Sequence, residues 1–175
     1  MISLSKKVCL LGDFAVGKTS LVRRFVYDLF DDKYLSTIGV KVSRKVIVLP
    51  RKDDIVELTL MLWDLTSTAE FDSVRISYLR GASGAILVCD LTRPATLDVL
   101  PGHLAELRQL NPAATFVLAA NKADLIERHE LTEAQVAQRA ADLGIPYFIT
   151  SAKTGANVEA AFRRLGKSII GEDRE

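Results

Sequence analysis

Cysteine is scarce in this sequence, with two among 175 residues. Cys9 and Cys89 both lie in apolar runs without the spacing of metal ligands, so we expect them to pack as small hydrophobic residues rather than form a disulfide framework. This usage fits a reducing, cytosolic compartment. Long apolar runs are lacking too, because none approaches the roughly 18–20 residues that span a bilayer. The first residues also lack a signal peptide pattern. We therefore expect a cytoplasmic protein.

The sequence also lacks an excess of either positive or negative charge. The sequence carries 23 Lys and Arg against 22 Asp and Glu, which gives a net charge of +1 with both signs interspersed. This balance argues against electrostatic binding to nucleic acid or to an anionic membrane. Hydrophobic residues make up 49% of a chain that shows no repeat or shift in composition. We expect one domain over residues 1–175, with residues 171–175 as a frayed tail.

The strongest motif is a glycine-rich stretch near the start of the chain. Residues 12–19 read G-D-F-A-V-G-K-T, after an apolar run and before a helical one. The order of strand, G-x-x-x-x-G-K-[ST] and helix predicts a phosphate-binding loop. Gly12 and Gly17 let successive N–H groups point inward, and the helix dipole adds positive potential. Lys18 supplies a charge for the outer phosphates, and the Thr19 hydroxyl can ligate a bridging Mg²⁺.

The rest of the chain alternates apolar strands with amphipathic helices. The expected strands are residues 7–11, 40–49, 55–63, 85–89, 115–120 and 147–150, and residues 50–54 join two of them in a hairpin. The expected helices include residues 20–26, a leucine pattern over 97–110 that Pro101 weakens, a helix with a capping box at 132–135, and 158–169. The pattern predicts an α/β fold with a six-stranded, mostly parallel sheet, helices on both faces and one antiparallel hairpin. In such folds ligands bind beyond the carboxyl ends of the strands.

Two of these strand ends carry further motifs, N-K-A-D at 121–124 and S-A-K at 151–153. The Asp124 carboxylate can accept hydrogen bonds from N1–H and the N2 amino group of guanine, whereas adenine would leave it unpaired. Asn121 can orient the neighbouring loops, and the Lys122 stem can cover one face of the base. The Ala152 N–H can donate to the guanine carbonyl. Together the motifs predict a guanine nucleotide as ligand.

With these motifs the chain resembles the Ras superfamily of small GTPases, and within it the Rab branch. The resemblance spans residues 7–170 and includes Y-L-S-T-I-G-V at 34–40, W-D at 63–64 and Y-L-R-G-A at 78–82. It implies a P-loop NTPase fold and a GTP/GDP switch that uses Mg²⁺. It also implies a monomer that engages protein effectors and regulators through its switch regions.

The resemblance also assigns roles that spacing alone does not. It implies that Phe30 packs edge-on against guanine, that Tyr34 covers the phosphates, and that Asp64 holds a metal-bound water. It implies that Thr37 closes over the γ-phosphate and ligates the metal together with Thr19. The expected nucleotide-binding residues are Phe14, Ala15, Val16, Gly17, Lys18, Thr19, Ser20, Phe30, Tyr34, Thr37, Ser67, Asn121, Lys122, Asp124, Ser151, Ala152 and Lys153. The expected metal ligands are Thr19, Thr37 and Asp64, and the expected catalytic residues are Lys18, Thr37 and Thr68.

The second switch departs from the family pattern. Residues 64–69 read D-L-T-S-T-A where the family has D-T-A-G-Q-E, so that Thr68 replaces the water-orienting glutamine and Ser67 replaces a glycine. A hydroxyl reaches less far than an amide. Phe14 stands where relatives carry Gly or Ser, and an aromatic ring there can obstruct an arginine from an activating partner. We expect slow GTP hydrolysis and a poor response to activators. The alternatives are a GTP-binding interaction module without hydrolysis and, more distantly, a P-loop kinase.

Partner surfaces depart from the Rab pattern as well. Trp63 and Tyr78 match two places of an aromatic trio that docks effectors, but Val42 replaces the third aromatic. Trp63 is expected to be exposed for recognition, with a core position as the alternative. The resemblance implies prenylated cysteines at the end of the chain, and residues 168–175 contain none. Either the sequence is truncated or the protein is not lipidated, so a peripheral membrane position would depend on partners. His103 and His129 are expected to be surface residues without partners.

Overall fold

The computed structural model describes residues 1–32, 39–65 and 72–172. The strands are β1 (Ile2–Gly12), β2 (Val40–Arg51), β3 (Asp54–Leu65), β4 (Ala82–Asp90), β5 (Thr115–Asn121) and β6 (Tyr147–Ile149). The helices are α1 (Lys18–Tyr27), α2 (Asp72–Leu79), α3 (Ala95–Asp98), α4 (Leu100–Leu110), α5 (Glu133–Leu143) and α6 (Val158–Ile170), with a 3₁₀ turn η2 at Ile126–Arg128.

The strands form one six-stranded sheet in the order β2-β3-β1-β4-β5-β6. The β2–β3 pair is antiparallel and the other pairs are parallel. This topology confirms the predicted α/β fold. The hairpin strands are longer than predicted, because Arg51 pairs with Asp54 and leaves only Lys52 and Asp53 in the turn. Lys52 takes a φ of 50°, the left-handed conformation of a tight hairpin turn.

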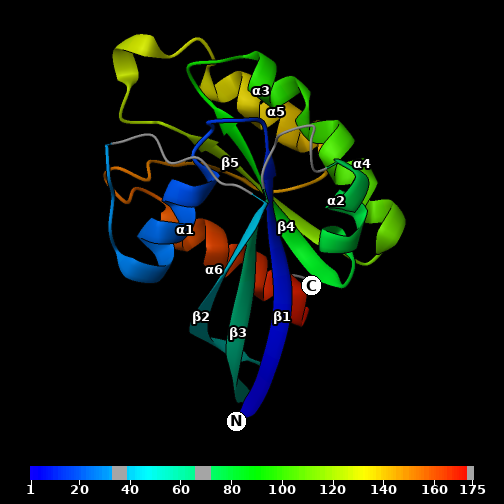
Figure 1. Cartoon of the computed structure of the whole chain (residues 1–175). Helices are drawn as coiled ribbons and strands as arrows, with labels where there is room; N and C mark the ends of the chain where they lie inside the picture. Colours follow the sequence, from blue (N-terminus) through cyan, green and yellow to red (C-terminus); the bar gives the residue numbers. More distant parts are fainter. Residues whose placement is uncertain (33–38, 66–71, 173–175) are drawn as a thin grey trace.

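Helices cover both faces of the sheet (Figure 1). Apolar side chains of α1 and α6 pack on one face, and those of α2, α4 and α5 pack on the other. On β3, the alternating residues Val56, Leu58, Leu60 and Leu62 are all fully buried, as their period of two predicts. Both cysteines are buried free thiols. Burial raises the pKa of Cys9 and of Cys89 to about 12, which makes both side chains apolar packing groups at neutral pH.

Other element boundaries differ from the sequence prediction as well. The first strand was expected at residues 7–11, but β1 begins at Ile2 because its polar first half pairs with β3 from Val56 onward. The leucine pattern over 97–110 forms two helices, α3 and α4, that meet at Val99. Pro101 lies in the first turn of α4, where its missing N–H costs no helical hydrogen bond. The capping box is confirmed, since Thr132 and Gln135 satisfy each other's backbone N–H groups at the start of α5.

The parallel register brings several strand ends to one edge of the sheet. Gly12 lies beside Val88, and Asp90 lies beside Asn121. On the other side of β1, Leu10 lies beside Asp64. The loops that follow β1, β3, β4 and β5 therefore meet, and this edge is where ligands of such sheets bind. Within the described part of the chain, every helix is too short or too polar to cross a membrane.

We predict that Phe162→Ala lowers the free energy of unfolding by about 3–5 kcal/mol. Phe162 is 1% exposed and stacks on Phe25 with ring centroids 4.2 Å apart, so its loss leaves a cavity between α6 and α1. Urea denaturation followed by circular dichroism measures the change. The control Val48→Ala alters a side chain that is 51% exposed and should change stability by no more than about 0.5 kcal/mol. Equal losses in the two variants would contradict the assignment of the core.

Candidate functional site

The glycine-rich loop connects the end of β1 to the start of α1. Gly17 has a φ of 101°, and a Cβ built on it would lie 2.3 Å from Asn121 Nδ2. A Cβ on Gly12 would lie 2.3 Å from the carbonyl oxygen of Val88. Both positions therefore exclude a side chain for lack of space as well as for conformation. Between them, Ala15 has a φ of 60° and Val16 is fully buried, which anchors the loop to the core.

Lys18, the first residue of α1, folds back over this loop. Its Nζ donates to the carbonyl oxygens of Gly12 at 2.9 Å and of Asp13 at 3.0 Å. Burial lowers the pKa of Lys18 to about 8, although the nearby Asp64 carboxylate acts in the opposite direction. An ammonium held in a buried position above a loop is a favourable partner for an anion, and phosphate oxygens are such anions. Ser20 follows in the first turn of α1 and is half-buried.

Two oxygen donors lie next to the loop. The Thr19 hydroxyl donates to Oδ2 of Asp64, which is 1% exposed near the end of β3. A hydroxyl and a carboxylate are hard ligands of the kind that Mg²⁺ prefers, and Mg²⁺ takes few protein ligands beside phosphate and water. The donor set therefore fits the expected metal. The third expected ligand, Thr37, lies outside the described residues.

Asn121 connects the phosphate loop with the loop after β6. Its Nδ2 donates to Val16 O at 3.0 Å, while its Oδ1 accepts from Thr150 Oγ1 at 3.2 Å and from Ala152 N at 3.3 Å. The side chain is 2% exposed, so these bonds are shielded from water. The expected orienting role of Asn121 has a direct basis in these contacts. The Ala152 N–H, expected to meet guanine, donates to Asn121 here.

The carboxylate of Asp124 is oriented by the neighbouring loop. Ser151 Oγ donates to Asp124 Oδ1 at 2.8 Å and accepts from Thr154 N at 3.1 Å. Ser151 is 1% exposed, which makes it a fixed support for a half-buried carboxylate. The Lys153 side chain is exposed, and its Nζ lies 3.7 Å from Asp32 Oδ1. Ser151 thus fixes the orientation of the Asp124 carboxylate, which is a hydrogen-bond acceptor.

An arginine on α1 supports the same loop, and sequence reasoning missed it. Arg24 donates from Nε to Ala152 O at 2.8 Å and from Nη2 to Lys153 O at 2.5 Å. Its Nη1 lies 2.9 Å from Asp28 Oδ1. A planar guanidinium suits two adjacent carbonyls, so Arg24 fixes the backbone of the S-A-K loop. No pattern in the sequence distinguishes this arginine from other helix-surface charges.

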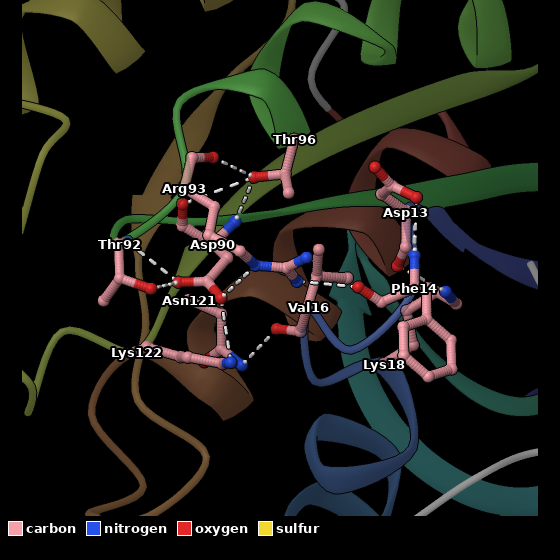
Figure 2. Close-up of polar contacts among 10 residues, drawn as sticks. All are labelled: Asp13, Phe14, Val16, Lys18, Asp90, Thr92, Arg93, Thr96, Asn121 and Lys122. Atoms are coloured by element: carbon pink, nitrogen blue, oxygen red, sulfur yellow. Dashed lines mark hydrogen bonds and ion pairs between the residues drawn. The ribbon is translucent and has the colours of Figure 1, made fainter.

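A second missed residue is Asp90, which ends β4 and is fully buried (Figure 2). Its Oδ1 accepts from Thr92 N at 2.8 Å and Thr92 Oγ1 at 2.7 Å, and its Oδ2 lies 2.8 Å from Lys122 Nζ and 3.1 Å from Arg93 Nε. Burial alone would raise the pKa of Asp90, but the hydrogen bonds from Lys122, Thr92 and Arg93 outweigh it and lower the pKa. The signal was a polar residue directly after an apolar strand, the same signal that identified Asn121.

The aromatic residues expected at partner or base surfaces are placed as follows. Trp63 is half-buried, with its ring 6.2 Å from that of Tyr78 and with Lys7 Nζ 3.7 Å above it. Trp63 is therefore neither fully exposed, as expected, nor fully in the core, as in the alternative. Phe14 is 49% exposed, whereas Phe30 is half-buried and packs beside the α1 and α6 core. Tyr34, Thr37, Ser67 and Thr68 lie outside the described residues, so their expected roles stay predictions.

The two histidines are half-buried and have partners, so the prediction that they lack partners is wrong. His129 Nε2 lies 3.0 Å from Lys122 O. His103 is half-buried on α4, and its Nδ1 lies 2.6 Å from Nη2 of Arg75, whose Nε pairs with Glu106 at 3.1 Å. Burial, and then the charge of Arg75, lower the pKa of His103 to about 4. Neutral His103 and charged Glu106 thus hold α2 against α4.

The regions of the chain that match known proteins contain the motifs of this site. A sequence model described as the Ras family matches residues 7–171. The chain is also similar to the GTP-binding protein ypt5 of Schizosaccharomyces pombe, with 36% identity over 176 residues. The alignment covers 99% of this chain and 82% of that relative. Both matches therefore extend from the phosphate loop to the S-A-K loop.

We predict that His103 makes stability depend on pH between about 6.5 and 4. Unfolded His103 takes up a proton near its ordinary pKa, while the folded side chain stays neutral until about pH 4. Its contribution is therefore complete above pH 6.5 and is lost as the pH falls through this window. His103→Gln keeps an acceptor for Arg75 and should flatten the profile by on the order of 1–2 kcal/mol. Urea denaturation at half-unit pH steps measures this, and identical profiles would contradict the assignment.

Proposed function

The chain belongs to the Ras family, close to its Rab branch, and on that premise we propose a molecular switch that cycles between GTP and GDP with slow hydrolysis. Members of this family bind guanine nucleotide, and the site supports that activity here. The observation that carries the proposal is the buried Asn121 side chain, which bonds to the phosphate loop and to the S-A-K loop at once. One ligand that spans both loops fits this construction.

The described residues suit the parts of a guanine nucleotide. The N–H groups of residues 15–20 and the Lys18 ammonium would bind the phosphates, whereas the Phe14 N–H donates to Asp13 Oδ1. Thr19 and Asp64, with Thr37, would hold Mg²⁺, directly or through water, and the ion would neutralise phosphate charge when bound. Asp124, oriented by Ser151, would select guanine, with Phe30, Lys122, Ala152 and Lys153 around the base. Tyr34 and Ser67 complete the proposed set.

Slow hydrolysis follows from the residues that would position the attacking water. Thr68 stands in place of the water-orienting glutamine and Ser67 in place of a glycine, so the proposal rests on sequence there. At the phosphate loop, the ring of Phe14 is 49% exposed, which fits the proposed obstruction of an arginine from an activator. The second candidate is a module that holds GTP without hydrolysing it, and the same substitutions favour it.

The proposed partners follow from the surfaces around the switches. Trp63 and Tyr78 pack together, and Val42 beside Trp63 on β2 is 44% exposed. We propose that effectors and regulators bind this mixed aromatic and aliphatic surface. The protein is proposed to act as a monomer in the cytoplasm, and to reach membranes only through such partners.

We predict that the wild type binds GDP and GTP at least about a hundredfold more tightly than ADP and ATP, because adenine offers the Asp124 carboxylate neither the N1–H nor the N2 amino group of guanine. Asp124→Asn should weaken GDP and strengthen xanthosine diphosphate, since the amide NH₂ donates to the xanthine 2-carbonyl where the carboxylate accepted from an amino group. Fluorescent nucleotide titration measures both affinities. Asp142→Asn on α5 is the control and should leave them unchanged. Equal affinity of the wild type for ADP would overturn guanine recognition.

We predict that Thr68→Gln accelerates single-turnover GTP hydrolysis by on the order of ten- to a hundredfold, because an amide can orient water that a hydroxyl does not reach. Timed γ-phosphate release with Mg²⁺ measures the rate. Wild-type hydrolysis as fast as that of a glutamine-containing relative would contradict slow turnover. An unchanged rate in the variant would instead place the limitation at Ser67 or Phe14. No turnover in either protein would favour the non-hydrolysing module.

A further inference from the structure

Arg93 reaches from the loop after β4 to the back of the phosphate loop. Its Nη2 donates to Phe14 O at 2.6 Å, and its Nε lies 3.1 Å from Asp90 Oδ2 (Figure 2). The backbone of Arg93 is fixed as well, because its N–H donates to Asp90 O at 2.9 Å. The guanidinium therefore bridges a buried carboxylate and a carbonyl of the phosphate loop.

The carboxylate that holds Arg93 also holds the base loop. Asp90 Oδ2 lies 2.8 Å from Nζ of Lys122, which belongs to the N-K-A-D motif. Thr96 stabilises this corner, since its Oγ1 accepts from Asp90 N at 2.8 Å and donates to Arg93 O at 2.7 Å. A continuous set of polar contacts thus runs from Phe14 through Arg93 and Asp90 to Lys122. Charged partners make these bonds stronger than bonds between neutral groups.

The phosphate loop needs donors on the side away from its ligand. N–H groups that point inward at an anion leave the carbonyls of the same peptides pointing outward, and each carbonyl needs a partner. Lys18 bonds to the carbonyls of Gly12 and Asp13, but Lys18 is also the group expected to turn to the phosphates. Asn121 and Arg93 hold the carbonyls of Val16 and Phe14 from outside the cradle.

We propose that Arg93 is a positioning residue, which preorganises the phosphate loop for the outer phosphates of the nucleotide and slows nucleotide release. The assignment rests on the proposed guanine-nucleotide function. The role requires arginine, because its planar fork meets the Asp90 carboxylate and the Phe14 carbonyl together. A lysine ammonium at this position reaches only one of these acceptors well.

The experiment compares Arg93→Met and Arg93→Lys with the wild type. Affinities for GDP and for guanosine monophosphate are measured by competition with a fluorescent nucleotide, and GDP release is measured by stopped flow. Loss of one charged hydrogen bond should weaken GDP and speed its release about tenfold in Arg93→Met. The monophosphate has no outer phosphate, so its affinity should change by less than about twofold. Arg93→Lys should recover little of the loss.

Arg163→Met is the matched control. Arg163 on α6 also donates from Nη2 to a backbone carbonyl, Val48 O at 2.7 Å, and also lies near a carboxylate, with Nη1 3.8 Å from Glu159 Oε1. Its side chain is 36% exposed against 40% for Arg93, and its carbonyl partner lies on β2, away from the nucleotide loops. This variant should keep wild-type affinity for both nucleotides.

The outcomes distinguish a failure of the proposed guanine-nucleotide binding from a failure of the proposed role of Arg93. Tight binding of GDP over ADP by the wild type supports the proposed function alone, and its absence overturns both proposals. Where the wild type binds GDP, unchanged GDP affinity in Arg93→Met overturns the positioning role. Equal losses for the two nucleotides, or an equal loss in Arg163→Met, would indicate general destabilisation and overturn it too. Full recovery of GDP affinity in Arg93→Lys would show that a positive charge is sufficient, and it would overturn the requirement for arginine.

Discussion

A loop that directs its N–H groups at an anion must turn its carbonyls away, and those carbonyls need donors that do not belong to the ligand. The structure meets this constraint with three side chains from three elements. Lys18 from α1, Arg93 from the loop after β4 and Asn121 from the end of β5 donate to the carbonyls of successive parts of the loop. Because Lys18 is also the group expected to turn to the phosphates, Arg93 and Asn121 are the donors that hold the loop from the side away from the ligand.

The same donors make the phosphate and base loops one unit. Asn121 also accepts from Ala152, and Asp90, the partner of Arg93, also holds Lys122. The parallel sheet makes this possible, because β1, β4 and β5 are neighbours whose carboxyl ends share an edge. The contact between the loops also requires glycine at position 17. A Cβ on Gly17 would lie 2.3 Å from Asn121 Nδ2 and would separate the loops. In the proposed switch, affinity for phosphate and selection of the base would therefore depend on shared contacts.

The sequence was sufficient to predict the fold and the position of the glycine-rich loop between β1 and α1. Apolar alternation in β3 and the G-x-x-x-x-G-K-T run are local patterns with a single physical interpretation, and the structure has the predicted sheet and loop. Arg24 and Arg93 were missed because their partners, Ala152 and Phe14, lie 128 and 79 residues away along the chain. Such contacts depend on how distant loops meet in space, which neither periodicity nor spacing encodes. The histidine error has the same origin, since Arg75 and His103 meet only when α2 packs on α4.

The clamp on Phe14 bears on how the proposed switch would respond to an activating partner. An exposed aromatic ring can move aside when a partner binds, by a change of rotamer or by a shift of the backbone that carries it. Here the carbonyl of Phe14 is held by Arg93, and its N–H donates to Asp13 Oδ1 at 2.8 Å. The backbone of Phe14 is thus held at both of its polar groups. These contacts oppose a backbone shift that would carry the ring away from an incoming arginine. The proposed resistance to activators would then have one origin in the phosphate loop and another in the second switch.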